Sequence, residues 1–248
     1  HRRELVTMTR LLAAIKIYVL NQWRNRLYAI GIGVGVLAAI MLAWLAPIRR
    51  MAEVAPAIVL AVVGGSTLMY AGAMVLFERD ERTLAANLMT PLRTHEYLWS
   101  KVLTLASLST LESLVMLAGA IALRSCFDTV PFPNVVPFVL GLLAIGVIYV
   151  LAGIILVVRF RSLNEFLMPM AAVAIVGQLP IFYFIGIYQS SVLLWIPTSP
   201  PAMLIRGGFA TLTTIEFTYA AGYSALIIAA FAWWANVAFR THILKTEG

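Results

Sequence analysis

The stretch VVPFVLGLLAIGVIYVLAGIILVV, residues 135–158, contains no charged side chain. A helix needs about 20 consecutive apolar residues to cross the hydrocarbon core of a bilayer, so this stretch is long enough to span it. The run is also longer than the apolar face of an ordinary buried helix in a soluble protein. The stretch therefore predicts a membrane-spanning helix.

Similar apolar runs lie on both sides of this stretch. Of the 248 residues, 62% are hydrophobic and only 12% are charged, which is too few to cover a water-exposed surface. The runs lack the two-residue alternation of a transmembrane β-barrel. We predict an all-α membrane protein that forms a single transmembrane domain over residues 1–248. The predicted spans are about 27–46, 55–77, 98–123, 135–158, 166–188 and 217–239.

The basic residues predict the orientation of these six spans. With six spans both termini lie on one side, and that side receives all but four of the 18 Lys and Arg residues, namely Arg49, Arg50, Arg124 and Arg206. The positive-inside rule then predicts a multi-pass protein of the cell inner (plasma) membrane with both termini in the cytoplasm. The net charge of +7 indicates an affinity for anionic membrane lipids, and it is weak evidence for nucleic acid.

The segment before the first span has two distinct faces. Apolar residues recur at spacings of three and four, at Leu5, Met8, Leu12, Ile15 and Val19. The opposite face carries Arg3, Arg10, Asn21, Arg24 and Arg26. The pattern predicts an amphipathic helix in the membrane interface, and the alternative is a cytoplasmic helix packed on another part of the protein.

Two further patterns concern packing. Gly31 and Gly35 form a GxxxG pair, which lets helices approach closely either within one subunit or between subunits. Residues 189–216 contain apolar pieces that are too short to span, and Pro197, Pro200 and Pro201 interrupt any long helix. We predict a re-entrant hairpin there, before the last span.

No pattern of an active site occurs in the chain. A Walker A motif is absent, so this chain does not bind ATP by a P-loop, and no H-E-x-x-H or Cys/His cluster predicts a metal. No serine stands in a G-x-S-x-G context. The sequence therefore predicts a protein that is not an enzyme, with no catalytic residue, metal ligand or cofactor of its own.

Glu112 is the one carboxylate deep within a predicted span, where an ionised group is costly. Its functional interpretation is a proton, cation or substrate site. Its structural interpretation, which we favour, is a glutamate satisfied by Ser109, by Ser113 or by a neighbouring helix. Gln178 and Asn236 are the other strongly polar residues well inside spans, and the three together are candidates for a substrate pathway.

The stretch FERDERTLAANLMTPLRTHEYLWSK, residues 77–101, separates the second and third predicted spans. Acidic residues at its start favour a helix N-terminus. Leu84 and Leu88 share one helix face, and Thr90-Pro91 ends the helix. The pattern predicts a helix of about two turns, which a cytoplasmic partner can grip between the two spans.

This stretch resembles the coupling-helix region of ABC type 2 exporter permeases, whose pattern is F-E-R-E-x-G-T-L-x-x-L-x-x-T-P-L. Arg82 stands where the family has glycine. The positions that match are Phe77, Glu78, Arg79, Thr83, Leu84, Thr90, Pro91 and Leu92. The order of an interfacial helix, six spans and a proline-bearing re-entrant segment is similar to the family as well.

The resemblance implies a transmembrane subunit that exports a hydrophobic or amphipathic substrate, such as a drug, an antibiotic or a lipid. Two copies, or this chain and a related permease, form the pathway, and two separate ABC ATPase subunits bind ATP and Mg. The implied ATPase contact consists of Glu78, Arg79, Asp80, Glu81, Thr83, Leu84, Leu88, Thr90 and Pro91.

Two other functions remain open from the residues alone. One is an ion-coupled secondary transporter that uses Glu112, and the other is a membrane-embedded lipid enzyme or assembly factor. Dependence on a proton gradient without an ATPase would favour the first, and lipid turnover by the chain alone would favour the second.

Overall fold

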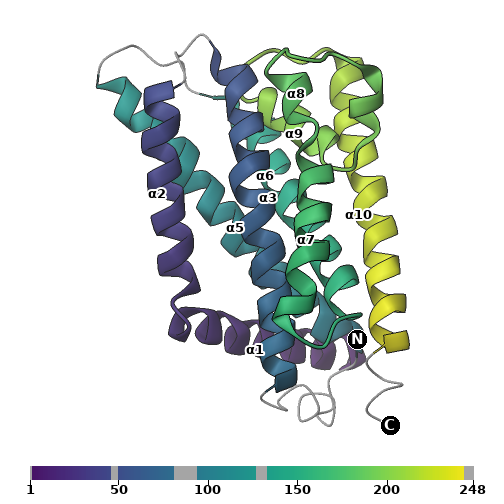
Figure 1. Cartoon of the computed structure of the whole chain (residues 1–248). Helices are drawn as coiled ribbons and strands as arrows, with labels where there is room; N and C mark the ends of the chain where they lie inside the picture. The colour runs from purple at the N-terminus through teal and green to yellow at the C-terminus, as the bar shows by residue number, and fades with distance from the viewer. Residues whose placement is uncertain (1, 46–49, 81–93, 127–132, 243–248) are drawn as a thin grey trace.

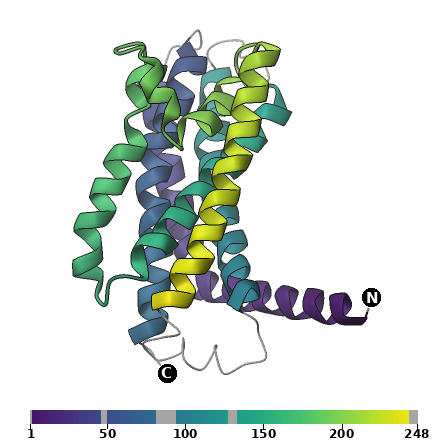
Figure 2. The same cartoon turned by 90° about the vertical axis from the view of Figure 1, so that its right-hand side faces the viewer.

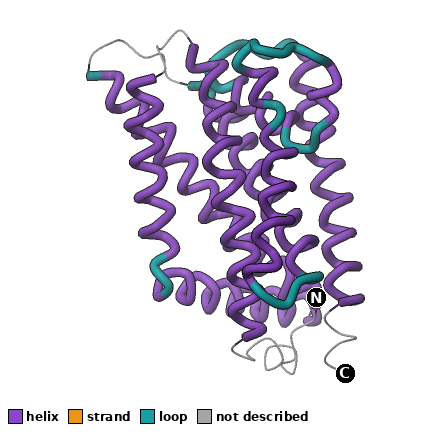
Figure 3. Tube along the Cα trace, viewed as in Figure 1, coloured by secondary structure: helices purple, strands orange, loops and turns teal. Residues whose placement is uncertain are grey.

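A computed structural model describes residues 2–45, 50–80, 94–126 and 133–242 of the chain. Over these residues the secondary structure is helical, and the described ranges contain no strand (Figure 3). The long helices are α1 (Arg2–Arg24), α2 (Leu27–Leu45), α3 (Met51–Asp80), α5 (Thr94–Ser125), α6 (Val135–Val157), α7 (Leu163–Gln178) and α10 (Thr214–His242). The short elements are α8 (Ile181–Phe184), η2 (Ser191–Trp195) and α9 (Ser199–Arg206).

Six helical segments of the described residues are long and apolar enough to cross a membrane, which confirms the predicted all-α membrane protein. They are Leu27–Trp44, Met51–Arg79, His95–Ser125, Val135–Val157, Leu163–Phe184 and Thr214–Phe239. The fifth ends four residues before the predicted limit of residue 188. Gly186 has a φ of 79°, a left-handed conformation that glycine adopts without strain, and the chain turns there.

Helix α6 lies at the centre of the bundle, in contact with α3, α5, α9 and α10 (Figure 1). Most of its residues are buried, which explains why its sequence is apolar on every side. At Gly141 a Cβ atom would lie only 2.7 Å from the Pro201 carbonyl oxygen and 2.8 Å from the Ile205 nitrogen. Only glycine therefore lets α9 pack so closely against α6.

The break in the fifth span is caused by the local sequence, and hydrogen bonds from other segments satisfy the backbone there. Pro180 has no backbone N–H, and α7 ends two residues before it. Inside a bilayer, carbonyl groups at such a break must find partners within the protein. The Gly177 carbonyl accepts hydrogen bonds from the Thr198 hydroxyl at 2.6 Å and the Tyr149 hydroxyl at 3.2 Å. These bonds tie α7 to α6 and to the start of α9.

The segment between α7 and α10 forms short elements at the end of the bundle opposite α1 (Figures 1 and 2). Residues Ser199–Ile205 of α9 are all buried. A Thr213–Glu216 capping box begins α10: the Glu216 carboxylate accepts from the Thr213 N–H at 2.8 Å, and the Thr213 hydroxyl accepts from the Glu216 N–H at 3.3 Å. The re-entrant path that we predicted for this region stays a prediction.

Helix α2 packs against α5 through its glycine pair. A Cβ atom on Gly35 would lie 2.9 Å from the Glu112 carbonyl oxygen, so the two backbones are in close contact. Gly31 faces Leu108 of the same helix. Of the two interpretations of the GxxxG pair, the structure supports packing within one subunit.

Helix α1 crosses one end of the bundle at a steep angle to the spans, and the end of α10 lies at the same level (Figures 1 and 2). Ala14, Tyr18 and Gln22, spaced four residues apart, are buried, and the Tyr18 ring packs edge-on against Tyr97 of α5. Of the predicted apolar face, Ile15 and Val19 are half-buried and Leu12 is exposed. Helix α1 thus packs on the bundle and also presents exposed apolar side chains.

Candidate functional site

The end of α3 that precedes residue 81 carries the first residues of the predicted ATPase contact. Glu78 forms an ion pair with Lys101 of α5, whose Nζ lies 2.7 Å from Glu78 Oε2. The Tyr97 hydroxyl donates a second hydrogen bond to the same oxygen at 2.6 Å. Because Lys101 is 1% exposed and the Glu78 side chain 13% exposed, the pair lies in the interior, where both charges need a partner.

Aromatic rings complete the surroundings of this ion pair. The Lys101 ammonium lies 4.6 Å from the centre of the Tyr97 ring and 5.7 Å from that of Tyr18 on α1, within range of cation–π attraction. Burial, and next the negative charge of Glu78, raise the pKa of Tyr18 well above its usual value. Its hydroxyl stays neutral, and the cluster of Tyr18, Glu78, Tyr97 and Lys101 joins α1, α3 and α5.

Arg79 makes a different connection. Its Nη1 atom donates to the Phe160 carbonyl oxygen at 2.9 Å, in the turn between α6 and α7. Glu78 and Arg79, adjacent in sequence, thus attach the end of α3 to α5 on one side and to the α6–α7 turn on the other. A displacement of the chain after α3 would reach all of these segments.

Asp80 is the last residue of α3. The other residues of the predicted contact, Glu81, Thr83, Leu84, Leu88, Thr90 and Pro91, lie outside the described residues. The predicted short helix between the spans and its contact with an ATPase therefore stay predictions.

Glu112 lies at a buried junction of α2, α3 and α5. Its side chain is 1% exposed, and its two carboxylate oxygens lie 3.0 Å and 3.2 Å from the Ser66 hydroxyl of α3. The Ser113 hydroxyl donates instead to the Ser109 carbonyl, at 2.8 Å. The partner of Glu112 is thus on a neighbouring helix, which was one of the predicted structural arrangements.

The other two polar residues inside spans are separate from Glu112. The Gln178 side chain on α7 donates to the Ala61 carbonyl of α3 at 3.2 Å. The Asn236 side-chain oxygen on α10 is buried without a hydrogen-bond partner. Within the described residues, no hydrogen bond joins these three side chains, and a shared role in a pathway stays a prediction.

A cavity of about 850 Å³ lies between α1, α2 and α3. Its wall includes Tyr18, Gln22, Tyr70, Met74 and Glu78, so it borders the buried ion pair. The sequence did not predict this cavity, because its wall comes from three helices that only the tertiary fold brings together.

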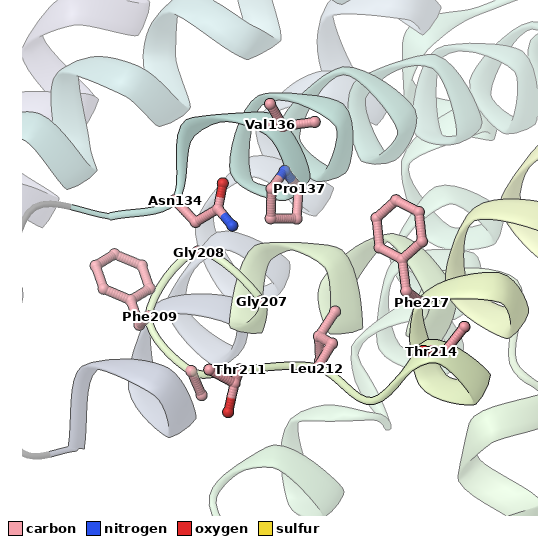
Figure 4. A pocket seen from close by; sticks show the side chains of 11 residues that line it. Asn134, Val136, Pro137, Gly207, Gly208, Phe209, Thr211, Leu212, Thr214 and Phe217 are labelled. Atoms are coloured by element: carbon pink, nitrogen blue, oxygen red, sulfur yellow. The ribbon is translucent and has the colours of Figure 1, made fainter.

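Two more hollows lie at the opposite end. One of about 720 Å³ lies between the start of α6 and the turn after α9, where Asn134, Gly208 and Phe217 are part of the wall (Figure 4). The other, of about 500 Å³, lies between η2 and α10 and is lined by Trp195, Tyr219 and Tyr223.

Three partners in these sites were not predicted from the sequence, namely Lys101, Tyr97 and Ser66. A signal for the ion pair exists: Glu78 ends one span and Lys101 begins the next, so antiparallel helices bring the opposite charges to the same depth. Ser66 has no comparable signal, because many hydroxyl side chains occur in the spans.

Comparison with known proteins adds the evidence of relatives. A family model of fluoroquinolones export permease proteins matches residues 9–247. Two fluoroquinolones export permease proteins of Mycobacterium tuberculosis, from strains CDC 1551 and H37Rv, are each 26% identical over 245 residues, covering 97% of this chain and 99% of the relative. The predicted resemblance to ABC exporter permeases is confirmed. The chain belongs to the fluoroquinolones export permease protein family.

Proposed function

We propose that this chain is the transmembrane subunit of an ATP-driven exporter that moves fluoroquinolone-like, amphipathic antibacterial compounds out of the cell. The relatives are named for fluoroquinolone export and match along nearly the whole chain, which supports this substrate class. Two ATPase subunits on separate chains bind ATP and Mg, and a second permease copy or a related chain completes the pathway.

The ATP-driven mechanism is supported by the bonds that Glu78 and Arg79 make to neighbouring segments. An ATPase that moves the segment after α3 pulls on two adjacent side chains, which are bonded to α5 and to the α6–α7 turn. Force is thereby passed to several spans, because closely packed interiors move as bodies rather than deform.

The orientation follows from the same proposal. Helix α1, the end of α10 and residues 81–93 face the cytoplasm, while α9 and Cys126 face outward. Residues 189–216 act as a re-entrant hairpin at the outer end. Leu84 and Leu88 occupy a groove on the ATPase, as the resemblance implies.

The test is to co-express the permease with its candidate ATPase and to measure both pull-down and fluoroquinolone efflux. Burying one leucine contributes about 1.5–3 kcal/mol, and a carboxylate in the groove would be unpaired. Leu84→Asp or Leu88→Asp should therefore abolish docking or efflux while the permease still inserts. Leu84→Met keeps an apolar side chain and is the matched control.

The energy source separates this proposal from ion-coupled transport. Efflux should require an intact ATPase and persist when an ionophore collapses the proton gradient. Efflux that continues without the ATPase, or Asp variants that dock and export like the parent, would contradict the ATP-driven proposal.

A further inference from the structure

The cavity between α1, α2 and α3 combines a largely apolar wall with a basic rim, as a binding site for a phospholipid does. We propose that it binds one anionic phospholipid of the adjacent leaflet, with an acyl chain in the cavity and the phosphate against Arg24 and Asn25. Such a lipid would be bound whether or not the exported compound and ATP are present.

The inner part of the wall suits an acyl chain. Tyr70, Ala73 and Met74 of α3 belong to it. The Glu78 carboxylate in the same wall already forms its ion pair with Lys101 at 2.7 Å, so it does not require a polar ligand atom. The volume of about 850 Å³ lies within the range of about 300–1,000 Å³ that is typical of ligand pockets. An acyl chain, which has no hydrogen-bonding group, fits such an interior.

The edge of the cavity is open to the hydrocarbon of the bilayer. Ile17 of α1, Ile30 of α2 and Phe77 of α3 belong to the wall, yet their side chains are 58%, 50% and 54% exposed. Apolar side chains that remain exposed together on a membrane protein mark a surface in contact with lipid. A lipid can therefore place one chain in the cavity, without crossing water, while its other chain stays in the leaflet.

The rim of the cavity suits a phosphate group. Arg24 and Asn25 lie at the corner between α1 and α2, where both are exposed and belong to the wall. Their side chains form no ion pair or hydrogen bond with the other described residues. A guanidinium group binds a phosphate through two parallel N–H···O bonds, and the asparagine amide can donate another. The corner thus offers free donors to a phosphate diester.

An aromatic pair places this corner at the depth of the lipid headgroups. The ring centres of Trp23 and Tyr28 lie 6.0 Å apart, and Trp23 is 68% exposed. Tryptophan and tyrosine gather at the membrane–water interface. Arg26 is exposed beside Arg24, so the corner favours an anionic headgroup over a zwitterionic one. From the corner, α2 and α3 lead into the bilayer, so the polar and apolar parts of the cavity follow the order of those in a phospholipid.

The experiment titrates the purified full-length permease with phosphatidylglycerol or phosphatidylcholine of the same acyl chains and counts bound lipid by native mass spectrometry. The parent should bind phosphatidylglycerol about fivefold more tightly. Arg24→Gln should raise the Kd of phosphatidylglycerol about fivefold, to the value for phosphatidylcholine. Ala73→Phe places a ring in the cavity and should raise the Kd of both lipids by about fivefold or more.

Lys16→Gln is the matched control, because Lys16 is an exposed basic residue of α1 that does not belong to the cavity wall. It removes the same charge from the same helix and should leave both Kd values unchanged. Glycerophosphate, which has the anionic group without a chain, should not compete with the lipid. Equal weakening by Lys16→Gln and Arg24→Gln would mean a diffuse attraction to the surface, and competition by glycerophosphate would mean a simple anion site. Either result would overturn the lipid site.

The unfolding temperature separates lipid binding from folding. Phosphatidylglycerol should raise the unfolding temperature of the parent and of Lys16→Gln, because a ligand that binds only the folded state stabilises it. Arg24→Gln should lose this rise, although its unfolding temperature in phosphatidylcholine stays close to that of the parent. An equal rise in Arg24→Gln and the parent would contradict the proposal. If Ala73→Phe does not fold, the comparison of Arg24→Gln with Lys16→Gln decides by itself.

Discussion

The almost completely buried side chain of Lys101 shows how the bundle holds a charge in its interior. The ammonium has Glu78 at 2.7 Å and two tyrosine rings around it. Taking both charges out of water offsets much of their attraction, so the pair adds little net stability compared with apolar residues. The pair matters because it links α3 to α5. Removing one of the two charges would leave the other buried without its ion partner, which would destabilise the fold.

Lys101→Met should therefore destabilise the permease by about 3 kcal/mol or more, because it removes the cation that balances the buried Glu78 carboxylate. The double variant Glu78→Gln with Lys101→Met should recover most of this loss, since no unpaired charge remains. Thermal unfolding in nanodiscs measures both effects. Equal unfolding temperatures for the single variant and the parent would mean that the pair is not formed. The double variant should still export poorly if the link to α5 transmits force.

Glu112 gives a second prediction about a single side chain. Because its contact is the Ser66 hydroxyl of the neighbouring helix, Glu112→Gln keeps an acceptor there and should retain most of the efflux and its pH dependence. Glu112→Leu should cost about 1 kcal/mol or less, because the Ser66 hydroxyl can still donate to the Val63 carbonyl at 3.2 Å. Efflux assays and unfolding of both variants give the measurement. Loss of efflux in the Gln variant, with normal folding, would make Glu112 a proton or substrate residue.

Among the helices, the contact of α6 with α9 depends on the absence of one side chain. Gly141→Ala places a Cβ atom 2.7–2.8 Å from backbone atoms of α9, which cannot move as a flexible side chain would. We expect a loss of about 1–3 kcal/mol of stability. Thermal unfolding provides the measurement.

Gly33→Ala is the matched control for this change. Gly33 is also inside a helix, but a Cβ atom there has open space around it. Alanine should raise stability by about 0.5–1 kcal/mol, because glycine is the poorer helix former. Opposite signs for the two glycines are expected, and equal effects would contradict the close approach of α6 and α9.

The orientation of the molecule as a whole can be tested with its single cysteine. Cys126 is exposed, at the end of α5 opposite to α1. It should react with a membrane-impermeant maleimide added to intact cells. In a Cys126→Ser background, a cysteine replacing the exposed Lys16 on α1 should react only after lysis. The reverse labelling pattern would invert the proposed topology.

The number and type of the spanning helices could be predicted from the sequence, because the bilayer makes this a local property. Each backbone N–H and C=O in lipid must be paired within its own helix, so a long apolar run determines a span by itself. The family resemblance was local as well, since it rests on residues 77–101. The capping box that begins α10 is also a short-range pattern.

The candidate sites depend on contacts between segments that are distant in sequence. Gln22 lines a cavity with Tyr70 and Glu78 only because α1 crosses the end of the bundle. Ser66 reaches Glu112 across 46 positions of sequence. Such pairs depend on how helices rotate and pack, and apolar faces in lipid give no periodic signal that sets this rotation. The sequence by itself thus determined six spans and the kind of protein, while the tertiary structure alone decided which polar side chains meet and where the cavities lie.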